Sequence, residues 1–166
     1  MSGPAFDRNF DPRALLAALD RHRVDYIVIG ALARVIHGTP EVTDELDIVP
    51  SLKKRNLERL DNALAELAPD AAVSAEQLAD PPEPVLRAET RYGRLAIVPE
   101  PTGTRGYDDL KRTARREHLG QGLRPQIAST QDLGRMLNTL NRSEDRAKLR
   151  DLRRVEELQL GRGIER

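Results

Sequence analysis

A short apolar strand that ends at a glycine, followed by a second strand with two carboxylates, constrains the fold of this 166-residue chain more than any other feature. The first strand is expected over residues 26–29, directly before Gly30, and the second over residues 45–49. Because side chains alternate across a strand, Glu45 and Asp47 project from the same face while the apolar residues between them enter the core. The sequence therefore predicts two carboxylates side by side near a strand end.

Two neighbouring carboxylates suit a divalent metal ion. Mg2+ takes oxygen ligands at about 2.0–2.1 Å and is usually held by one or two carboxylates together with substrate phosphates. Gly30 has no Cβ, so backbone N–H groups can approach a phosphate there, and the helix expected after it presents the positive end of its dipole. Acidic residues also flank strands simply because strand ends meet water. The glycine turn and the helix favour Mg2+ (or Mn2+) at Glu45 and Asp47.

This segment resembles the minimal nucleotidyltransferases of the polymerase-beta superfamily, and most closely the abortive-infection (AbiEii-like) toxin type. The matching residues carry the glycine turn, a helix that ends in His-Gly, and the acidic strand; they are residues 24–33, 37–40 and 43–50. The resemblance extends to residues 56–60, 91–95, 103–110 and 142–146, and so spans most of residues 24–150. The resemblance implies an α+β fold, a nucleotidyltransferase-like mixed β-sheet covered by helices, with further helices at the C-terminus.

The same resemblance implies an activity. Members of the group transfer a nucleoside monophosphate from a nucleoside triphosphate (NTP) to an acceptor, here an RNA such as tRNA or a protein, and a cognate antitoxin would be a partner. Glu45 and Asp47 would be the catalytic, metal-binding pair. The residues expected to contact the nucleotide are Gly30, Ala31, Thr43, Arg142 and Arg146.

Four positions depart from the family pattern. They are the second turn glycine, the first metal carboxylate, a third carboxylate after the Tyr-Gly turn, and a basic residue on the C-terminal helix, which are here Ala31, Glu45, Ala96 and Leu137. Loss of a catalytic base or metal ligand costs on the order of 10^2 to 10^4 in rate. Two interpretations therefore stay open: a toxin-like nucleotidyltransferase, or a catalytically degenerate relative that binds nucleotide, RNA or a protein partner without turnover.

Composition limits the alternatives. The length fits a single domain over residues 1–166, with a core at about 12–128 and a C-terminal helical part at about 129–160. Cysteine is absent, which argues against thiolate metal sites and disulfides. No apolar run approaches the roughly 20 residues of a membrane span, and no signal-peptide pattern is seen. We expect a cytoplasmic protein that does not insert into membranes.

The net charge of zero hides an asymmetry. Residues 1–100 contain 12 Lys and Arg against 17 Asp and Glu, whereas residues 101–166 contain 15 against 10. The final helix carries Arg146, Arg150, Arg153 and Arg154. Such a face suits RNA phosphates. Acidic residues lie between these arginines, however, which is more typical of a solvated helix with paired charges.

The spacing of apolar and turn residues predicts the remaining elements. Helices are expected from Pro12, over about 52–67, 107–116 and 131–140, and from Ser143 to about residue 160. Residues 85–90 and 94–98 flank a Tyr-Gly turn and predict a hairpin that extends the sheet beside the acidic strand, and a short strand is expected near 125–128. Thr130 is the expected N-cap of the helix that follows.

Overall fold

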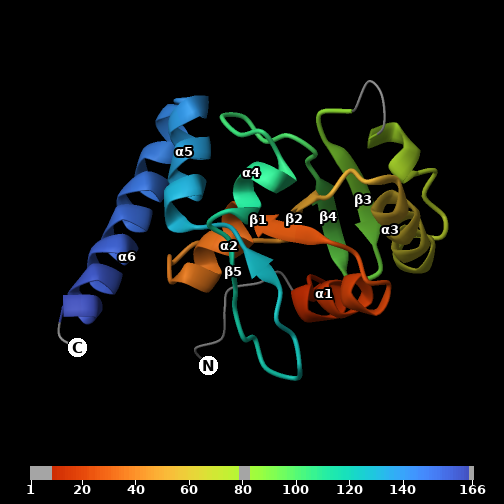
Figure 1. Cartoon of the computed structure of the whole chain (residues 1–166), viewed down its shortest axis with the longest axis horizontal. Coiled ribbons are helices and arrows are strands. Elements are labelled where there is room, and N and C mark those ends of the chain that lie inside the picture. Colours follow the sequence, from red (N-terminus) through yellow and green to blue (C-terminus); the bar gives the residue numbers. More distant parts are fainter. Residues whose placement is uncertain (1–8, 79–82, 165–166) are drawn as a thin grey trace.

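A six-stranded mixed sheet forms the centre of the molecule (Figure 1). The computed structural model of the chain describes residues 9–78 and 83–164. The strands are β1 (Tyr26–Ile29), β2 (Glu45–Pro50), β3 (Leu86–Thr90), β4 (Gly93–Ile97), β5 (Arg115–Arg116) and β6 (Gln126–Ile127), in the spatial order β3-β4-β2-β1-β6-β5. β2 pairs with β4, and β1 with β6, in parallel; the other neighbours are antiparallel. The predicted α+β class is confirmed.

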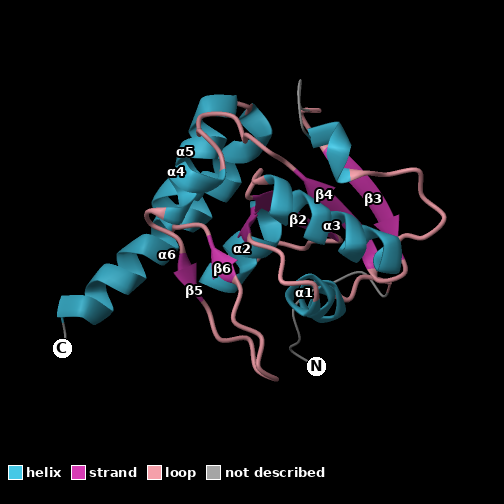
Figure 2. Cartoon of the chain, turned by 45° about the vertical axis from the view of Figure 1, so that its right-hand side comes forward, coloured by secondary structure: helices cyan, strands magenta, loops and turns pink. Residues whose placement is uncertain are grey.

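Helices cover this sheet (Figure 2). They are α1 (Pro12–Arg21), α2 (Gly30–His37), α3 (Lys54–Leu67), α4 (Tyr107–Lys111), α5 (Thr130–Leu140) and α6 (Arg146–Ile164), with short 3-10 turns at Ala75–Leu78 and Ser143–Asp145. α1 packs on α3, while α5 packs on both α2 and α6. Figure 1 shows α5 and α6 together at one side of the sheet, with the acidic strand β2 in its middle. Among the described residues, no helix combines the length and the apolar character that a membrane crossing requires.

The two strands expected to carry the site form as predicted, for a local physical reason. β1 lies in the middle of the sheet and all four of its residues are buried, as expected for a short continuous apolar strand. Over residues 45–48 of β2 the burial alternates, so that Leu46 and Ile48 are fully buried while Glu45 and Asp47 face the other way. The hairpin of β3 and β4 lies beside β2, which also confirms the prediction.

Two local predictions need correction. The helix expected over residues 107–116 ends at Lys111, because Arg115–Arg116 pairs instead with β6 through its backbone and forms the edge strand β5. The N-cap of α5 is Ser129 rather than Thr130, since the Ser129 hydroxyl accepts from the Asp132 N–H (3.1 Å).

Asn56, on α3, connects this helix to the start of β1 and the end of β2 through hydrogen bonds. Its Oδ1 accepts from the Asp25 N–H at 2.7 Å, and its Nδ2 donates to the backbone oxygens of Asp25 at 2.9 Å and Ser51 at 2.7 Å. The side chain is only 3% exposed. One buried amide therefore satisfies three backbone groups at the start of β1 and just past the end of β2.

We expect Asn56→Ala to lower the free energy of unfolding by about 3 kcal/mol, because it leaves buried backbone groups without partners. Asn62→Ala is the matched control, since Asn62 lies on the same helix but is exposed. Urea unfolding of both variants measures the difference. Equal and small losses would show that the Asn56 bonds contribute little.

Candidate functional site

Gly30 joins β1 to α2 and lies directly against Asp47. Its φ of +70° belongs to the left-handed region, and a Cβ there would lie 2.2 Å from Asp47 Oδ2. The strand register explains the contact, because Ile29 is the pairing partner of Asp47. Position 30 thus requires glycine both for its backbone conformation and for the space that the carboxylate occupies.

The Asp47 carboxylate is buried and incompletely satisfied. Its Oδ1 has no hydrogen-bond partner within the described part of the chain. Burial, together with the adjacent Glu45 carboxylate, raises the pKa of Asp47 to about 7, against the smaller opposing effects of Arg34 and Arg87. An unpartnered buried oxygen beside a second carboxylate is costly in the ionised state, and a divalent cation is the kind of group that would relieve it.

Asp47 faces a cavity of about 360 Å³ between the sheet and the C-terminal helices. The glycine turn contributes Gly30 and Ala31, and α5 contributes an apolar wall that includes Met136 and Leu137. Positive charge comes from Arg34, Arg142 and Lys148. A carboxylate, a turn with a close backbone approach, an apolar wall and cations therefore line one space.

Two of these cations are held by one buried carboxylate. Arg142 donates from Nε to Asp145 Oδ2 (2.7 Å) and from Nη2 to Oδ1 (3.1 Å), and Lys148 Nζ donates to Oδ1 at 3.2 Å. The Asp145 side chain is fully buried. These bonds, with Arg142 first, hold the pKa of Asp145 below its usual value. Asp145 therefore positions Arg142 and Lys148 at the cavity.

We expect Asp145→Asn to destabilise the fold by about 1–2 kcal/mol at neutral pH, because a charge-assisted pair becomes a neutral one. Since the pKa of Asp145 is lowered by folding, its contribution is complete above the ordinary aspartate pKa and is lost as pH falls through the lowered value. The difference between wild type and variant should therefore disappear in acid. Asp151→Asn, on the adjoining helix α6, is the control, and a pH-independent difference would contradict this account.

Arg34 lines the cavity but forms its ion pair with Glu41, which lies outside it. It donates from Nε and Nη2 to Glu41 at 2.7 and 2.9 Å, and Glu41 also accepts from the Thr39 hydroxyl at 2.8 Å. This pair anchors the loop that leads into β2. Arg34 still acts on Asp47 electrostatically, because its charge opposes the rise in the pKa of that carboxyl.

The structure brings together some of the residues predicted from the sequence and separates others. Gly30, Ala31, Asp47 and Arg142 line the cavity. Glu45 lies on β2 two residues before Asp47, is not one of the residues that line the cavity, and forms an ion pair with Arg87 at 3.6 Å. The Thr43 hydroxyl instead donates to the backbone oxygen of Glu45 (3.0 Å) and so stabilises the start of β2.

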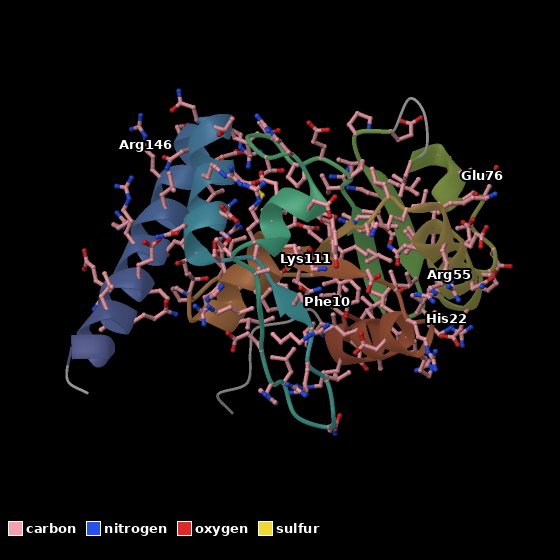
Figure 3. The ribbon with its side chains drawn as sticks, viewed as in Figure 1. Phe10, His22, Arg55, Glu76, Lys111 and Arg146 are labelled. Carbon is pink, nitrogen blue, oxygen red and sulfur yellow. The ribbon has the colours of Figure 1, made fainter. Side chains whose placement is uncertain are left out.

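Arg146 lies on the outside of α6 (Figure 3), in an exposed group with Arg150, Arg153 and Arg154. Arg34 and Lys148 also line the cavity, although the motifs in the sequence do not indicate them. The spacing of Arg142, Asp145 and Lys148 by three residues is the signal that could have indicated Lys148.

Ala96 and Leu137, two of the positions that depart from the pattern implied by the resemblance, both lie close to Asp47 or its cavity. Ala96 is 2% exposed and is the β4 neighbour of Asp47, so no third carboxylate stands there. Within residues 9–78 and 83–164, no group of three or more His, Cys, Asp or Glu side chains is arranged to hold a metal ion. Leu137 is a buried part of the apolar wall, and Arg142 and Lys148 supply positive charge near it.

His37 has a structural contact at the end of α2. Its Nε2 lies 2.8 Å from the backbone oxygen of Ala128, just after β6. The ring therefore ties α2 to the segment that leads into α5. This agrees with a structural role for His37 rather than a catalytic one.

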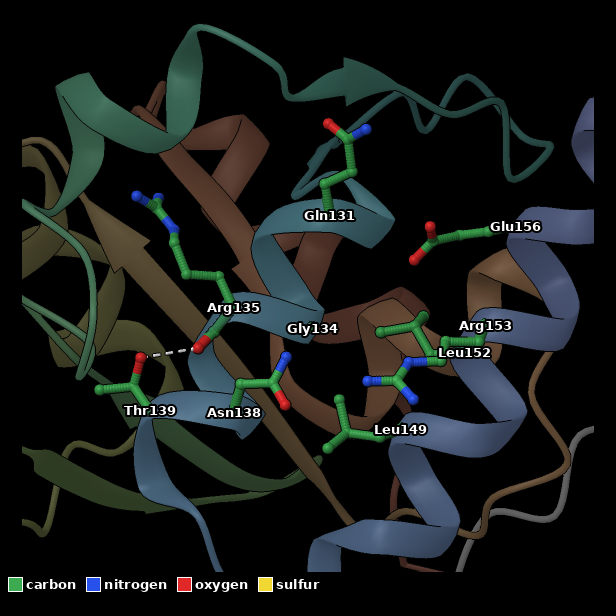
Figure 4. A pocket seen from close by; sticks show the side chains of 9 residues that line it. All are labelled: Gln131, Gly134, Arg135, Asn138, Thr139, Leu149, Leu152, Arg153 and Glu156. Carbon is green, nitrogen blue, oxygen red and sulfur yellow. Dashed lines mark hydrogen bonds between the residues drawn. The ribbon is translucent and has the colours of Figure 1, made fainter.

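A larger cavity, of about 530 Å³, lies between α5 and α6 (Figure 4). It is lined mainly by polar side chains, such as Asn138 and Arg153. No buried carboxylate without a partner faces it among the described residues. The Asp47 cavity is therefore the better candidate site despite its smaller volume.

Comparison with known proteins gives the fold a name. No family model matches the chain, and no curated protein matches it. Among solved structures, the chain is similar to a protein from Thermotoga maritima whose 1.87 Å crystal structure is described as that of a "putative nucleotidyltransferase". The TM-score is 0.56 at 16% sequence identity, and the match covers 84% of this chain and 88% of the other. The chain therefore has a nucleotidyltransferase-like fold.

Proposed function

We propose that this protein binds an NTP with Mg2+ (or Mn2+) in the Asp47 cavity and transfers the nucleoside monophosphate to an acceptor. The observation that carries the proposal is the buried, unpartnered Oδ1 of Asp47 beside Glu45, in a cavity that also presents Arg142 and Lys148. Buried charge without a partner is rarely retained in a protein unless it has a use. A metal ion and the phosphates it accompanies would satisfy both the carboxylates and the cations.

Each residue has a defined part in this proposal. Glu45 and Asp47 would hold the ion, which when bound neutralises phosphate charge and polarises the phosphoryl oxygen. Gly30 lets the backbone at the start of α2 approach the triphosphate, and Arg142 and Lys148 meet its negative charge. The apolar wall of α5 offers a surface for the base.

For the acceptor we favour RNA, such as tRNA, over protein. Support comes from the exposed face of α6, where the four arginines Arg146, Arg150, Arg153 and Arg154 have no ion pair with any described residue. Unpaired arginines on one helix suit phosphate backbones better than the solvated, paired face that the sequence also allowed. A toxin-like role with a cognate antitoxin is the corresponding biological proposal, and it rests on the family resemblance alone.

A second function is favoured by one observation. Ala96 occupies the strand position beside Asp47 where the resemblance implies a third carboxylate. In-line displacement between two metal ions requires stabilisation of both the attacking and the leaving oxygen. A protein with only Glu45 and Asp47 would bind the nucleotide and act through occupancy rather than turnover.

One experiment separates the two functions. Each of the four NTPs, labelled at the α-phosphate, is incubated with the protein, Mg2+ or Mn2+, and either total RNA or total protein, beside an Asp47→Ala control. Transfer that the control abolishes supports the nucleotidyltransferase. Metal-dependent binding measured by calorimetry without transfer supports the binding protein. Absence of both, with folded protein, overturns the proposed function.

A further inference from the structure

Arg87 lies in line with Asp47 across three strands. In the pairing register, Arg87 of β3 is the partner of Ala96 in β4, and Ala96 is the partner of Asp47 in β2. Residues paired in this way share one face of the sheet. The Arg87 side chain continues across β4, because its Nε lies 3.6 Å from Oε1 of Glu45.

Ala96 makes this reach possible. Neighbouring strands lie about 4.8 Å apart, so β3 and β2 are separated by about twice that distance, which an arginine side chain can span. A methyl group at position 96 leaves the path free, whereas a larger side chain would occupy it. The Arg87 guanidinium thus reaches Glu45 across Ala96, the position that lacks the third carboxylate.

The electrostatics follow from this arrangement. A guanidinium close to Glu45 and Asp47 repels a cation that approaches from the β4 side, whereas it attracts phosphate. The Arg87 side chain remains 63% exposed, and at 3.6 Å its ion pair with Glu45 is longer than a hydrogen bond. Its fork of N–H donors is therefore available to a ligand.

We propose that Arg87 takes the place of a second metal ion, so that the site binds one divalent ion per nucleotide and Arg87 itself contacts the phosphate. This inference rests on the proposed function, since it assumes that a metal ion and a nucleotide occupy the Asp47 site. It explains why Ala96 and the Arg87–Glu45 pair occur together. It also identifies Arg87 as a phosphate-binding residue outside the wall formed by α5 and α6.

Mn2+ binding provides a test that does not depend on turnover. Bound Mn2+ is counted by equilibrium dialysis, first alone and then with the α,β-methylene analogue of whichever NTP binds. Wild type should bind one ion per chain in the presence of the analogue. In Arg87→Ala, affinity for Mn2+ alone should rise several-fold, while affinity for the analogue at saturating Mn2+ should fall about tenfold, the loss expected for a charge-assisted phosphate contact.

Three further variants test whether the effect of Arg87 depends on its position in the site or only on its positive charge. Arg87→Lys should retain part of the analogue affinity, because it keeps the charge but not the fork. Arg94 lies on the same face of the sheet and donates to Glu89 at 2.8 Å. Arg94→Ala should therefore change the affinity for Mn2+ and the affinity for the analogue by no more than about threefold. The double variant Arg87→Ala/Ala96→Asp should bind a second Mn2+ with the analogue.

The outcomes distinguish this inference from the proposed function. Two Mn2+ ions per wild-type chain, or unchanged analogue affinity in folded Arg87→Ala, would overturn the role of Arg87 while leaving the nucleotide site intact. If wild type binds neither Mn2+ nor the analogue, the proposed function itself fails. Opposite changes in the two affinities of Arg87→Ala would support the inference, since a purely structural ion pair does not predict them.

Discussion

Gly30→Ala is expected to abolish measurable binding of Mn2+ with nucleotide and to destabilise the fold by about 3 kcal/mol. The magnitude combines backbone strain at a positive φ with the overpacking of a buried contact. The added Cβ would lie 2.2 Å from Asp47 Oδ2, so the carboxylate has to leave its position for the chain to fold. Stability is measured by urea unfolding and binding by calorimetry.

Gly122→Ala is the matched control for this prediction. Gly122 has a φ of +78°, close to that of Gly30, but nothing lies within 4 Å of a Cβ built there. It should therefore show the backbone strain alone, about 1 kcal/mol, with unchanged binding. If the two glycine variants lose equal stability and both retain binding, then the contact between Gly30 and Asp47 has no functional importance.

The parts of the site that could be predicted from the sequence are those fixed by local geometry. Glu45 and Asp47 share a face because side chains alternate along a strand, whatever the rest of the fold does. Gly30 was identified because an apolar strand ends there. Only a few consecutive residues determine each of these features, and the pairing of Ile29 with Asp47 then brings the two segments into contact.

The cations could not be predicted in the same way, because their positions depend on how α6 packs. Arg146 was expected at the nucleotide and instead faces solvent, while Lys148 lines the cavity. Arg142, just before the 3-10 turn Ser143–Asp145, and Lys148, in the first turn of α6, both donate to the buried Asp145 carboxylate, whereas Arg146 is exposed. The burial of Asp145 therefore decides which cations lie at the cavity, and this burial depends on tertiary packing.

Arg87 required still longer-range information. Its relation to the acidic pair depends on two strand registers at once, β3 with β4 and β4 with β2. A shift of one residue in either would move the guanidinium to the opposite face. In the sequence Arg87 is one arginine among many, 40 positions after Asp47 in the numbering.

Asp47→Asn is expected to stabilise the metal-free protein above pH 7, although it removes a proposed metal ligand. Folding raises the pKa of Asp47 from 3.8 to about 7, so between these values the folded state binds a proton that the unfolded state does not. Wild-type stability in EDTA should therefore fall as pH rises through this window, by about 1.4 kcal/mol per pH unit at most. The groups that face this carboxyl are Glu45, Arg34 and Arg87.

The variant should lack this slope, since an amide does not titrate, and should match wild type most closely near pH 4. Mg2+ should reverse the order at pH 7.5. If the site binds the ion, a concentration 100 times Kd stabilises wild type by about 2.7 kcal/mol and leaves Asp47→Asn almost unchanged. A slope that persists in the variant would assign the titration to another group, and equal stabilisation of both proteins by Mg2+ would place the ion away from Asp47. If Asp47 serves metal binding rather than folding, Asp47→Asn should be more stable than wild type without metal. It should also gain less stability than wild type when Mg2+ is added.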